Sequence, residues 1–149
     1  MAATVSQWNP TGSETNCMAC VARYLHYQLL GTWVDAEKSR VLEWQSEPET
    51  IDGSAPTLAL QKKMAIARTK SIIESVGLIE VDRHDAYVGR YSYPKGHYAV
   101  IGYDKGHVIY GYVEEDGQNF TTLYCPQSDG EYPLSRLGGR ALAMRFRVS

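Results

Sequence analysis

The chain has 149 residues, of which 44% are hydrophobic and 21% charged, proportions that suit one soluble domain over residues 1–149. Its formal net charge of −2 gives no bulk attraction to nucleic acid or to an anionic membrane, and no apolar run approaches the roughly 20 residues that span a bilayer. Three cysteines are too few, and odd in number, for a disulfide scaffold, and they favour a reducing compartment.

The N-terminal part of the chain predicts a helix that begins near Cys17. Residues 1–12, MAATVSQWNPTG, lack the basic and apolar regions of a signal peptide. A cluster of turn and cap residues follows, and Ser13, Thr15 or Asn16 could cap the helix. Apolar side chains then recur at helical spacing, at Met18, Val21, Leu25 and Leu29. A glycine at position 31 is a suitable stop.

Two further helices are expected before residue 77. The first covers Asp35–Gln45, with four side chains facing the core: Val34, Val41, Leu42 and Trp44. Residues 46–56 have the composition of a loop. The second helix is capped by Thr57, continues to about Val76 and ends at Gly77.

The remaining sequence indicates strands. LIEVD at 78–82 predicts the first, and DAYVGRYSYPKG at 85–96 predicts an exposed connection. The hydrophobic period then becomes two, which predicts strands at 97–104, 107–115 and 119–125, joined by turns at Lys105-Gly106 and Asp116-Gly117. ALAMRFRV at 141–148 predicts a last strand, which Arg145 and Arg147 favour as an edge. Helices followed by strands indicate an α+β fold, with N-terminal helices packed on a C-terminal antiparallel sheet.

Cys17 and Cys20 lie three residues apart. A zinc site would need a second pair of ligands, and a thioredoxin-like redox pair would follow a strand that is absent here. Two buried core cysteines are the plain alternative. A nucleophile at a helix start has a chemical rationale, because the unpaired N–H groups and the positive dipole end lower the pKa of a thiol and can hold an oxyanion. Cys17, at the expected helix start, is the better candidate.

A cysteine nucleophile needs a base that the fold brings within hydrogen-bond reach. Four histidines compete for that role. His26 lies within the first helix, His84 in a charged segment and His107 beside a predicted turn. His97 begins a strand directly after a glycine, which allows another segment to approach closely. We therefore predict that His97 is the base; a half-buried strand histidine is the alternative.

The third catalytic residue would orient the imidazole ring. If Lys105-Gly106 is a two-residue turn, His97 lies opposite Glu114, and opposed residues share a face of the sheet. Asp116 is the next acidic candidate. The alternative for this acidic run is a solvated turn.

In combination, these residues resemble the papain-fold toxin domains of bacterial polymorphic toxins and secreted effectors, a group that includes glutamine deamidases. The family pattern is Asn-Cys at a helix start, Leu-x-Gly-x-x-Val-x-Ala, Gly-His at a strand start, and an acidic residue followed by Gln. TNCMACVARYL, LLGTWVDA (with an offset of one residue) and KGHYAVIGY carry the first three elements. The fourth departs: Cys125-Pro126-Gln127 lacks the acid, and Asp116-Gly117-Gln118 lies in a predicted turn. The third residue therefore stays open.

The resemblance implies a papain-like fold and acyl transfer through a thioester. Cys17 would attack a carbonyl carbon, His97 would move the proton, and the Cys17 backbone N–H with the Asn16 or Asn9 side chain would hold the oxyanion. Deamidation, proteolysis and transamidation share such a site, and the resemblance favours deamidation of glutamine on a target protein. It also implies a secreted effector acting in the cytoplasm of a target cell, with a cognate immunity protein and with neither cofactor nor metal. The alternative is a papain-like module that binds a partner without catalysis.

Overall fold

The computed structural model describes residues 8–13, 16–46, 58–103 and 106–149. Its helices are α2 (Cys17–Leu30), α3 (Ala36–Gln45) and α4 (Leu58–Glu74). Its strands are β1 (Leu78–Tyr87), β2 (Gly96–Gly102), β3 (Val108–Val113), β4 (Thr122–Cys125), β5 (Gly130–Glu131) and β6 (Arg140–Val148), with the 3-10 helix η2 (Leu134–Leu137) before β6. Helices followed by an antiparallel sheet confirm the α+β prediction. Within these ranges, no helix is long and apolar enough to cross a membrane.

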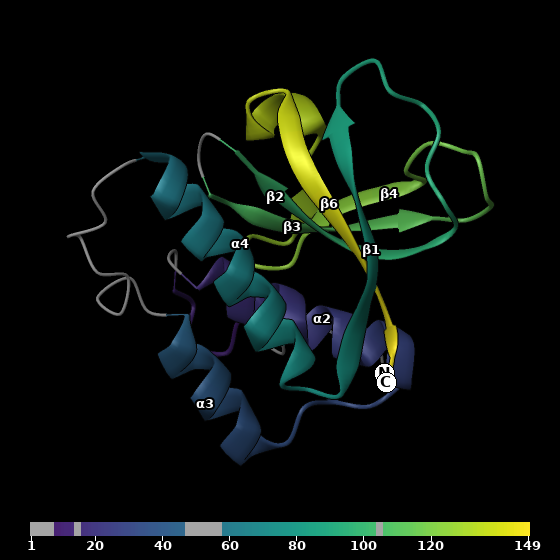
Figure 1. Cartoon of the computed structure of the whole chain (residues 1–149). Coiled ribbons are helices and arrows are strands. Elements are labelled where there is room, and N and C mark those ends of the chain that lie inside the picture. Colours follow the sequence, from purple (N-terminus) through teal and green to yellow (C-terminus); the bar gives the residue numbers. More distant parts are fainter. Residues whose placement is uncertain (1–7, 14–15, 47–57, 104–105) are drawn as a thin grey trace.

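Helix α2 begins and ends where its sequence signals predict. Its first residue is Cys17, and Gly31 follows its end in the left-handed conformation (φ 74°), which a residue without Cβ adopts at little cost. The backbone N–H of Gly31 donates to the Tyr27 carbonyl at 2.8 Å. The helix packs against α3 and α4 on one side and against β2, β3 and β6 on the other (Figure 1). It is therefore the central helix of the molecule.

Helix α3 lies on the outer side of α2. Its N-cap is Asp35, whose side chain accepts a hydrogen bond from the Lys38 backbone N–H at 2.9 Å. Leu42 is its buried residue, whereas Val41 is exposed and Trp44 is 68% exposed. The prediction that these two side chains face the core is therefore wrong, because α3 packs mainly against one neighbouring helix and buries only a narrow stripe. The predicted cap of the next helix, residue 57, lies outside the described residues.

The strand order is β1-β6-β2-β3-β4-β5, and every pairing is antiparallel. The last strand, β6, lies between β1 and β2, so the prediction of an edge strand is wrong. Its Arg145 is accommodated inside the sheet because Asp82 of β1 accepts from it, with Nη2 and Oδ2 2.5 Å apart. Pairing with β6 also extends β1 to Tyr87, five residues past the predicted end.

The β2–β3 hairpin has a register different from the predicted one. His97 pairs with Tyr112, not with Glu114. The Gly102 backbone N–H donates to the His107 carbonyl at 2.9 Å, and β3 begins only at Val108, so the connection is longer than the predicted two-residue turn. A shift of two residues keeps each side chain on its face. It also leaves Glu114 beyond the end of β3.

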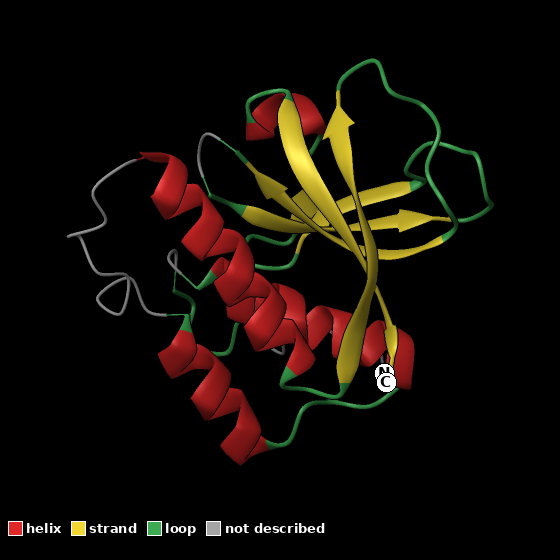
Figure 2. Ribbon diagram, viewed as in Figure 1, coloured by secondary structure: helices red, strands yellow, loops and turns green. Residues whose placement is uncertain are grey.

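The long helices cover one face of the sheet (Figure 2), and a cluster of buried hydrophobic side chains lies on each face. On the helical face, Ala99 and Ile101 of β2 pack with Val21 and Leu25 of α2. On the other face, alternate strand residues such as Val100 pack beneath η2 and the connection before β2. Helix α2 thus lies along the sheet, and its two ends are held over opposite ends of the β2–β3 hairpin.

Candidate active site

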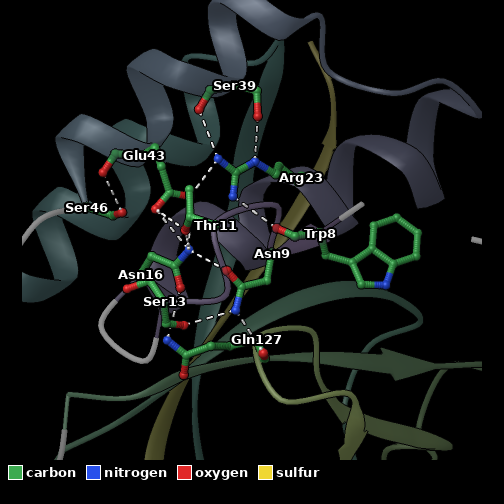
Figure 3. A network of polar contacts seen from close by, with 10 residues as sticks. All are labelled: Trp8, Asn9, Thr11, Ser13, Asn16, Arg23, Ser39, Glu43, Ser46 and Gln127. Carbon is green, nitrogen blue, oxygen red and sulfur yellow. Dashed lines mark hydrogen bonds and ion pairs between the residues drawn. The ribbon is translucent and has the colours of Figure 1, made fainter. Parts of the chain in front are cut away.

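A buried network of polar side chains holds the residue before α2 (Figure 3). The Asn16 carbonyl accepts the first helical hydrogen bond, from the Cys20 N–H at 3.1 Å. The Asn16 side chain makes no capping bond. Its Nδ2 donates instead to Asn9 Oδ1 at 2.8 Å and to Glu43 Oε1 at 2.9 Å. The start of α2 is therefore fixed by tertiary contacts instead of a local cap.

The side-chain amides expected to hold the oxyanion are engaged in this network. Asn9 Nδ2 donates to the Ser13 carbonyl at 2.9 Å and to the Gln127 carbonyl at 3.0 Å. An amide nitrogen carries two hydrogens, so the donors of both Asn9 and Asn16 are used. These two residues anchor the site, and the backbone N–H groups at the start of α2 are the donors left for an oxyanion.

Cys17 is half-buried at the first position of α2. Burial raises the pKa of its thiol, and the charge of Cys125 raises it further. Hydrogen bonds from the backbone amides of Val108, Met18 and Cys17 lower the pKa, yet burial outweighs them. The helix start therefore acts on the sulfur as expected, but the resting side chain is a neutral thiol. Cys20, one turn further along, is fully buried, and burial raises its pKa as well.

His97 lies at the other end of the hairpin. Its Nδ1 is 2.7 Å from the Tyr110 hydroxyl, and its ring lies 4.7 Å from that of Tyr112. Burial lowers the pKa of the imidazole. The side chain lines a cavity of about 430 Å³ together with Leu29 and Asp116.

Two measures show that Cys17 and His97 are not neighbours. Leu29, which lines the cavity of His97, follows Cys17 by twelve residues, or about 18 Å of helix. Val108, whose backbone amide contacts the Cys17 sulfur, pairs with Ile101, about 13 Å along β2 from His97. The structure therefore places the predicted nucleophile and the predicted base at opposite ends of α2.

The two acidic candidates lie on the surface, and Asp116 shares the cavity of His97. Glu114 and Asp116 are both exposed. Asp116 Oδ1 accepts from the Lys95 backbone N–H at 2.6 Å, and the Glu114 backbone N–H donates to Thr121 Oγ1 at 3.0 Å. Within the described part of the chain, neither carboxylate hydrogen-bonds an imidazole. The acidic run therefore has the contacts of a surface turn.

A different histidine lies near the start of α2. His107 Nε2 is 3.3 Å from Cys125 Sγ, and its ring lies 4.9 Å from that of Tyr132. Cys125 is 1% exposed and lies close enough to Cys17 to contribute to the raised pKa of that thiol. The residue after His107 is Val108, whose amide contacts the Cys17 sulfur. Cys17, His107 and Cys125 therefore all lie toward the same end of the hairpin.

The segment after Cys125 completes this cluster. Gln127 Nε2 donates to Asn16 Oδ1 at 3.2 Å, which joins the end of β4 to the start of α2. A sequence signal for His107 exists, because Lys-Gly-His occurs twice, at 95–97 and at 105–107. The first copy precedes β2 and the second precedes β3. After the second copy, only β3 intervenes before β4, which ends at Cys125 and is followed by Pro126-Gln127.

No protein-family model matches the chain, and comparisons with curated proteins and with solved structures give no match either. Among the residues that the structure describes, no three histidine, cysteine, aspartate or glutamate side chains gather as a metal site would require.

Proposed function

We propose that the chain is a cysteine-dependent acyl-transfer enzyme with a papain-like arrangement, in which Cys17 is the nucleophile and His107 the general base. The observation that carries this proposal is the meeting of the α2 start with the His107–Cys125 pair, through Val108 and Gln127. Gly106-His107 also fits the third element of the papain-fold toxin pattern, and Cys125-Pro126-Gln127 has the Gln of the fourth element with cysteine in place of its acid. His97, at the far end of α2, has no part in the proposed chemistry.

The proposed reaction follows from the protonation state of Cys17. Because burial raises the pKa of its thiol, the proton leaves as the sulfur attacks the glutamine carboxamide, and His107 accepts it. Backbone N–H groups at the start of α2 stabilise the oxyanion. The proton then passes to the departing ammonia, and water hydrolyses the thioester. The sum is glutamine and water converted to glutamate and ammonia.

Cys125 takes the position at which the family pattern has an acid. Its sulfur lies 3.3 Å from His107 Nε2, a contact that can fix the orientation of the imidazole ring. A cysteine side chain can orient the imidazole, but it does not offer the carboxylate that stabilises the imidazolium in a complete triad. The proposed enzyme is therefore a Cys17–His107 dyad with a weak third member.

The substrate class in this proposal comes from the resemblance. A papain-fold toxin of this type deamidates a glutamine on a protein of the target cell, is delivered into that cell as a secreted effector, and is neutralised by an immunity protein in the producing cell. Proteolysis and transamidation use the same intermediate and differ in which carbonyl is attacked and which group resolves the thioester.

The test compares three alanine variants by ammonia release from carbobenzoxy-glutaminyl-glycine and by intact mass spectrometry of candidate target proteins. Cys17→Ala and His107→Ala should each lower turnover by about 100-fold or more. His97→Ala is the matched control and should keep most of the activity. A gain of about one mass unit per site identifies deamidation. Activity that survives His107→Ala and disappears in His97→Ala would overturn the assignment.

A non-catalytic binding module is the second candidate. Two observations favour it: the raised pKa of Cys17 and the cysteine at the position of the orienting acid. A chain of this kind would bind its partner equally well as the Cys17→Ala variant and would change the mass of no target protein.

A further inference from the structure

Glu43 of α3 gathers donors from three separate segments. Its Oε1 and Oε2 lie 2.9 and 3.0 Å from Asn16 Nδ2. Oε1 is 2.8 Å from Arg23 Nη2, and Oε2 accepts from Thr11 Oγ1 at 3.2 Å. The Glu43 side chain is only 14% exposed, and none of the proposed chemical steps uses it. A carboxylate this well satisfied is a rigid anchor.

Arg23 fixes the carboxylate in place. Its side chain is 3% exposed and donates to three further acceptors. Nε donates to Ser39 Oγ at 2.8 Å, Nη2 to the Ser39 carbonyl at 2.9 Å, and Nη1 to the Trp8 carbonyl at 2.9 Å. The ion pair therefore joins α2, α3 and the loop before α2 in one geometry. A buried pair of this kind is costly to break from one side, because the remaining charge loses its partner.

The network continues from Glu43 through Asn16 to Gln127 (Figure 3). Glu43 holds Asn16 Nδ2, and Asn16 Oδ1 accepts from Gln127 Nε2 at 3.2 Å. Gln127 lies two residues after Cys125, the partner of His107. Hydrogen bonds and short stretches of backbone therefore connect Glu43 of α3 both to Cys17, which follows Asn16, and to Cys125, which precedes Gln127 by two residues.

We propose that Glu43 is a positioning residue that sets the Cys17–His107 geometry by fixing Asn16. Asn16 begins the helix that carries Cys17 and, through Gln127, holds the end of the strand that carries Cys125. The catalytic meaning of this role rests on the proposed function. A glutamine at position 43 cannot reproduce it, because an amide offers one acceptor oxygen where the carboxylate offers two, and it has no charge to match Arg23.

Loss of the contact between Glu43 and Asn16 should make alkylation of Cys17 faster and turnover of the enzyme slower. Release of Asn16 admits water to the start of α2, so the burial that keeps the thiol neutral is reduced. The pKa of Cys17 then falls, and its reaction with a small alkylating reagent becomes faster at neutral pH. Turnover becomes slower, because the sulfur and the imidazole lose their relative position. A purely structural contact would change neither property below the melting temperature.

The experiment uses Glu43→Gln in a Cys20→Ala background, because Cys20 shares a tryptic peptide with Cys17. Alkylation of Cys17 by iodoacetamide, read by peptide mass spectrometry, should be about threefold faster or more at neutral pH, with a lower pH midpoint. Ammonia release from carbobenzoxy-glutaminyl-glycine should fall by about tenfold or more. The matched control is Ser39→Ala, which removes a hydrogen bond of Arg23 and leaves the contact between Glu43 and Asn16.

The control decides between positioning and general weakening. Ser39→Ala should leave both rates within about twofold of the parent at a comparable loss of melting temperature. Equal effects of the two variants, or no effect of Glu43→Gln, would overturn the proposal. If Glu43→Gln does not fold, Asn16→Ala removes the amide that Glu43 holds without touching the ion pair with Arg23, and it carries the same expectation. If the parent shows no turnover, the proposed function fails, and the alkylation rates still decide the role of Glu43.

Discussion

At the scale of single residues, Cys17 shows two opposed physical effects. The start of a helix stabilises a thiolate through its unpaired N–H groups, and backbone hydrogen bonds from Met18 and Val108 act in that direction. Burial destabilises the anion and is the larger effect. In the proposed mechanism, activation of Cys17 therefore depends on proton transfer to His107 during attack, because no thiolate–imidazolium pair is present at rest.

The pH dependence of Cys17 alkylation tests this balance. In a Cys20→Ala background, the iodoacetamide rate should rise with pH and reach half its maximum above about pH 8.5, the ordinary midpoint of a cysteine. The native fold favours the neutral thiol, so unfolding in concentrated guanidinium chloride should bring the midpoint down to that ordinary value. A native midpoint below neutrality would show that the helix start outweighs burial.

Cys125 gives the second prediction at this scale. Cys125→Ala removes the partner of His107 Nε2 and should lower turnover by about 10- to 100-fold, as loss of an orienting group does. Cys125→Asp restores a charge-assisted partner and should be at least as active as the natural chain. Melting temperatures of both variants serve as the control. Full activity of Cys125→Ala would mean that this side chain only packs.

At the scale of elements, the cap of α3 has a measurable share in stability. Asp35 accepts from the Lys38 backbone N–H, and replacing such a cap with alanine costs about 1 kcal/mol. Urea denaturation of Asp35→Ala should show that loss in the free energy of unfolding. Glu37→Ala is the matched control, because Glu37 is exposed in the same turn and should cost only a few tenths of a kcal/mol. Equal costs would show that the cap contributes nothing specific.

The elements also show which features the sequence could predict. Local signals suffice for α2 and α3, because a helix start and stop depend on nearby residues such as Asp35 and Gly31. The length of β1 and the interior place of β6 were not predictable in this way, because they arise from pairing between segments some sixty residues apart. Charged residues suggested an edge for β6, yet Asp82 neutralises Arg145 within the sheet.

The same contrast between local signals and long-range packing applies to the cysteine and the histidine of the candidate site. Cys17 is predictable because its position at a helix start is local. The histidine is not, because His97 and His107 follow the same Lys-Gly dipeptide and both stand at strand starts. The two histidines are distinguished by the direction in which α2 lies on the sheet. Because of that direction, the Cys17 end of α2 lies near the His107 end of the hairpin and the Leu29 end lies near His97. That direction is a tertiary property.

At the scale of the whole molecule, the sheet contains several buried phenols. Burial is the main cause that raises the pKa of Tyr98, to about 12, and that of Tyr110 and Tyr124. The buried thiol of Cys20 is shifted in the same direction for the same reason. All four groups are therefore neutral in the native state at pH values where they ionise in an unfolded chain.

These shifts predict that the fold is lost under alkaline conditions. In the unfolded chain, cysteine ionises near pH 8.5 and tyrosine near pH 10, whereas the native groups keep their protons. The native state then binds more protons than the unfolded state, so stability is complete below about pH 8.5 and falls as pH rises further. Urea midpoints should therefore decline between about pH 9 and pH 11. Tyr110→Phe, which keeps the ring and removes the phenol, should make the decline shallower, whereas Tyr91→Phe, at a side chain 68% exposed, should not. A midpoint that is constant or rises over this range would mean that these groups ionise without unfolding.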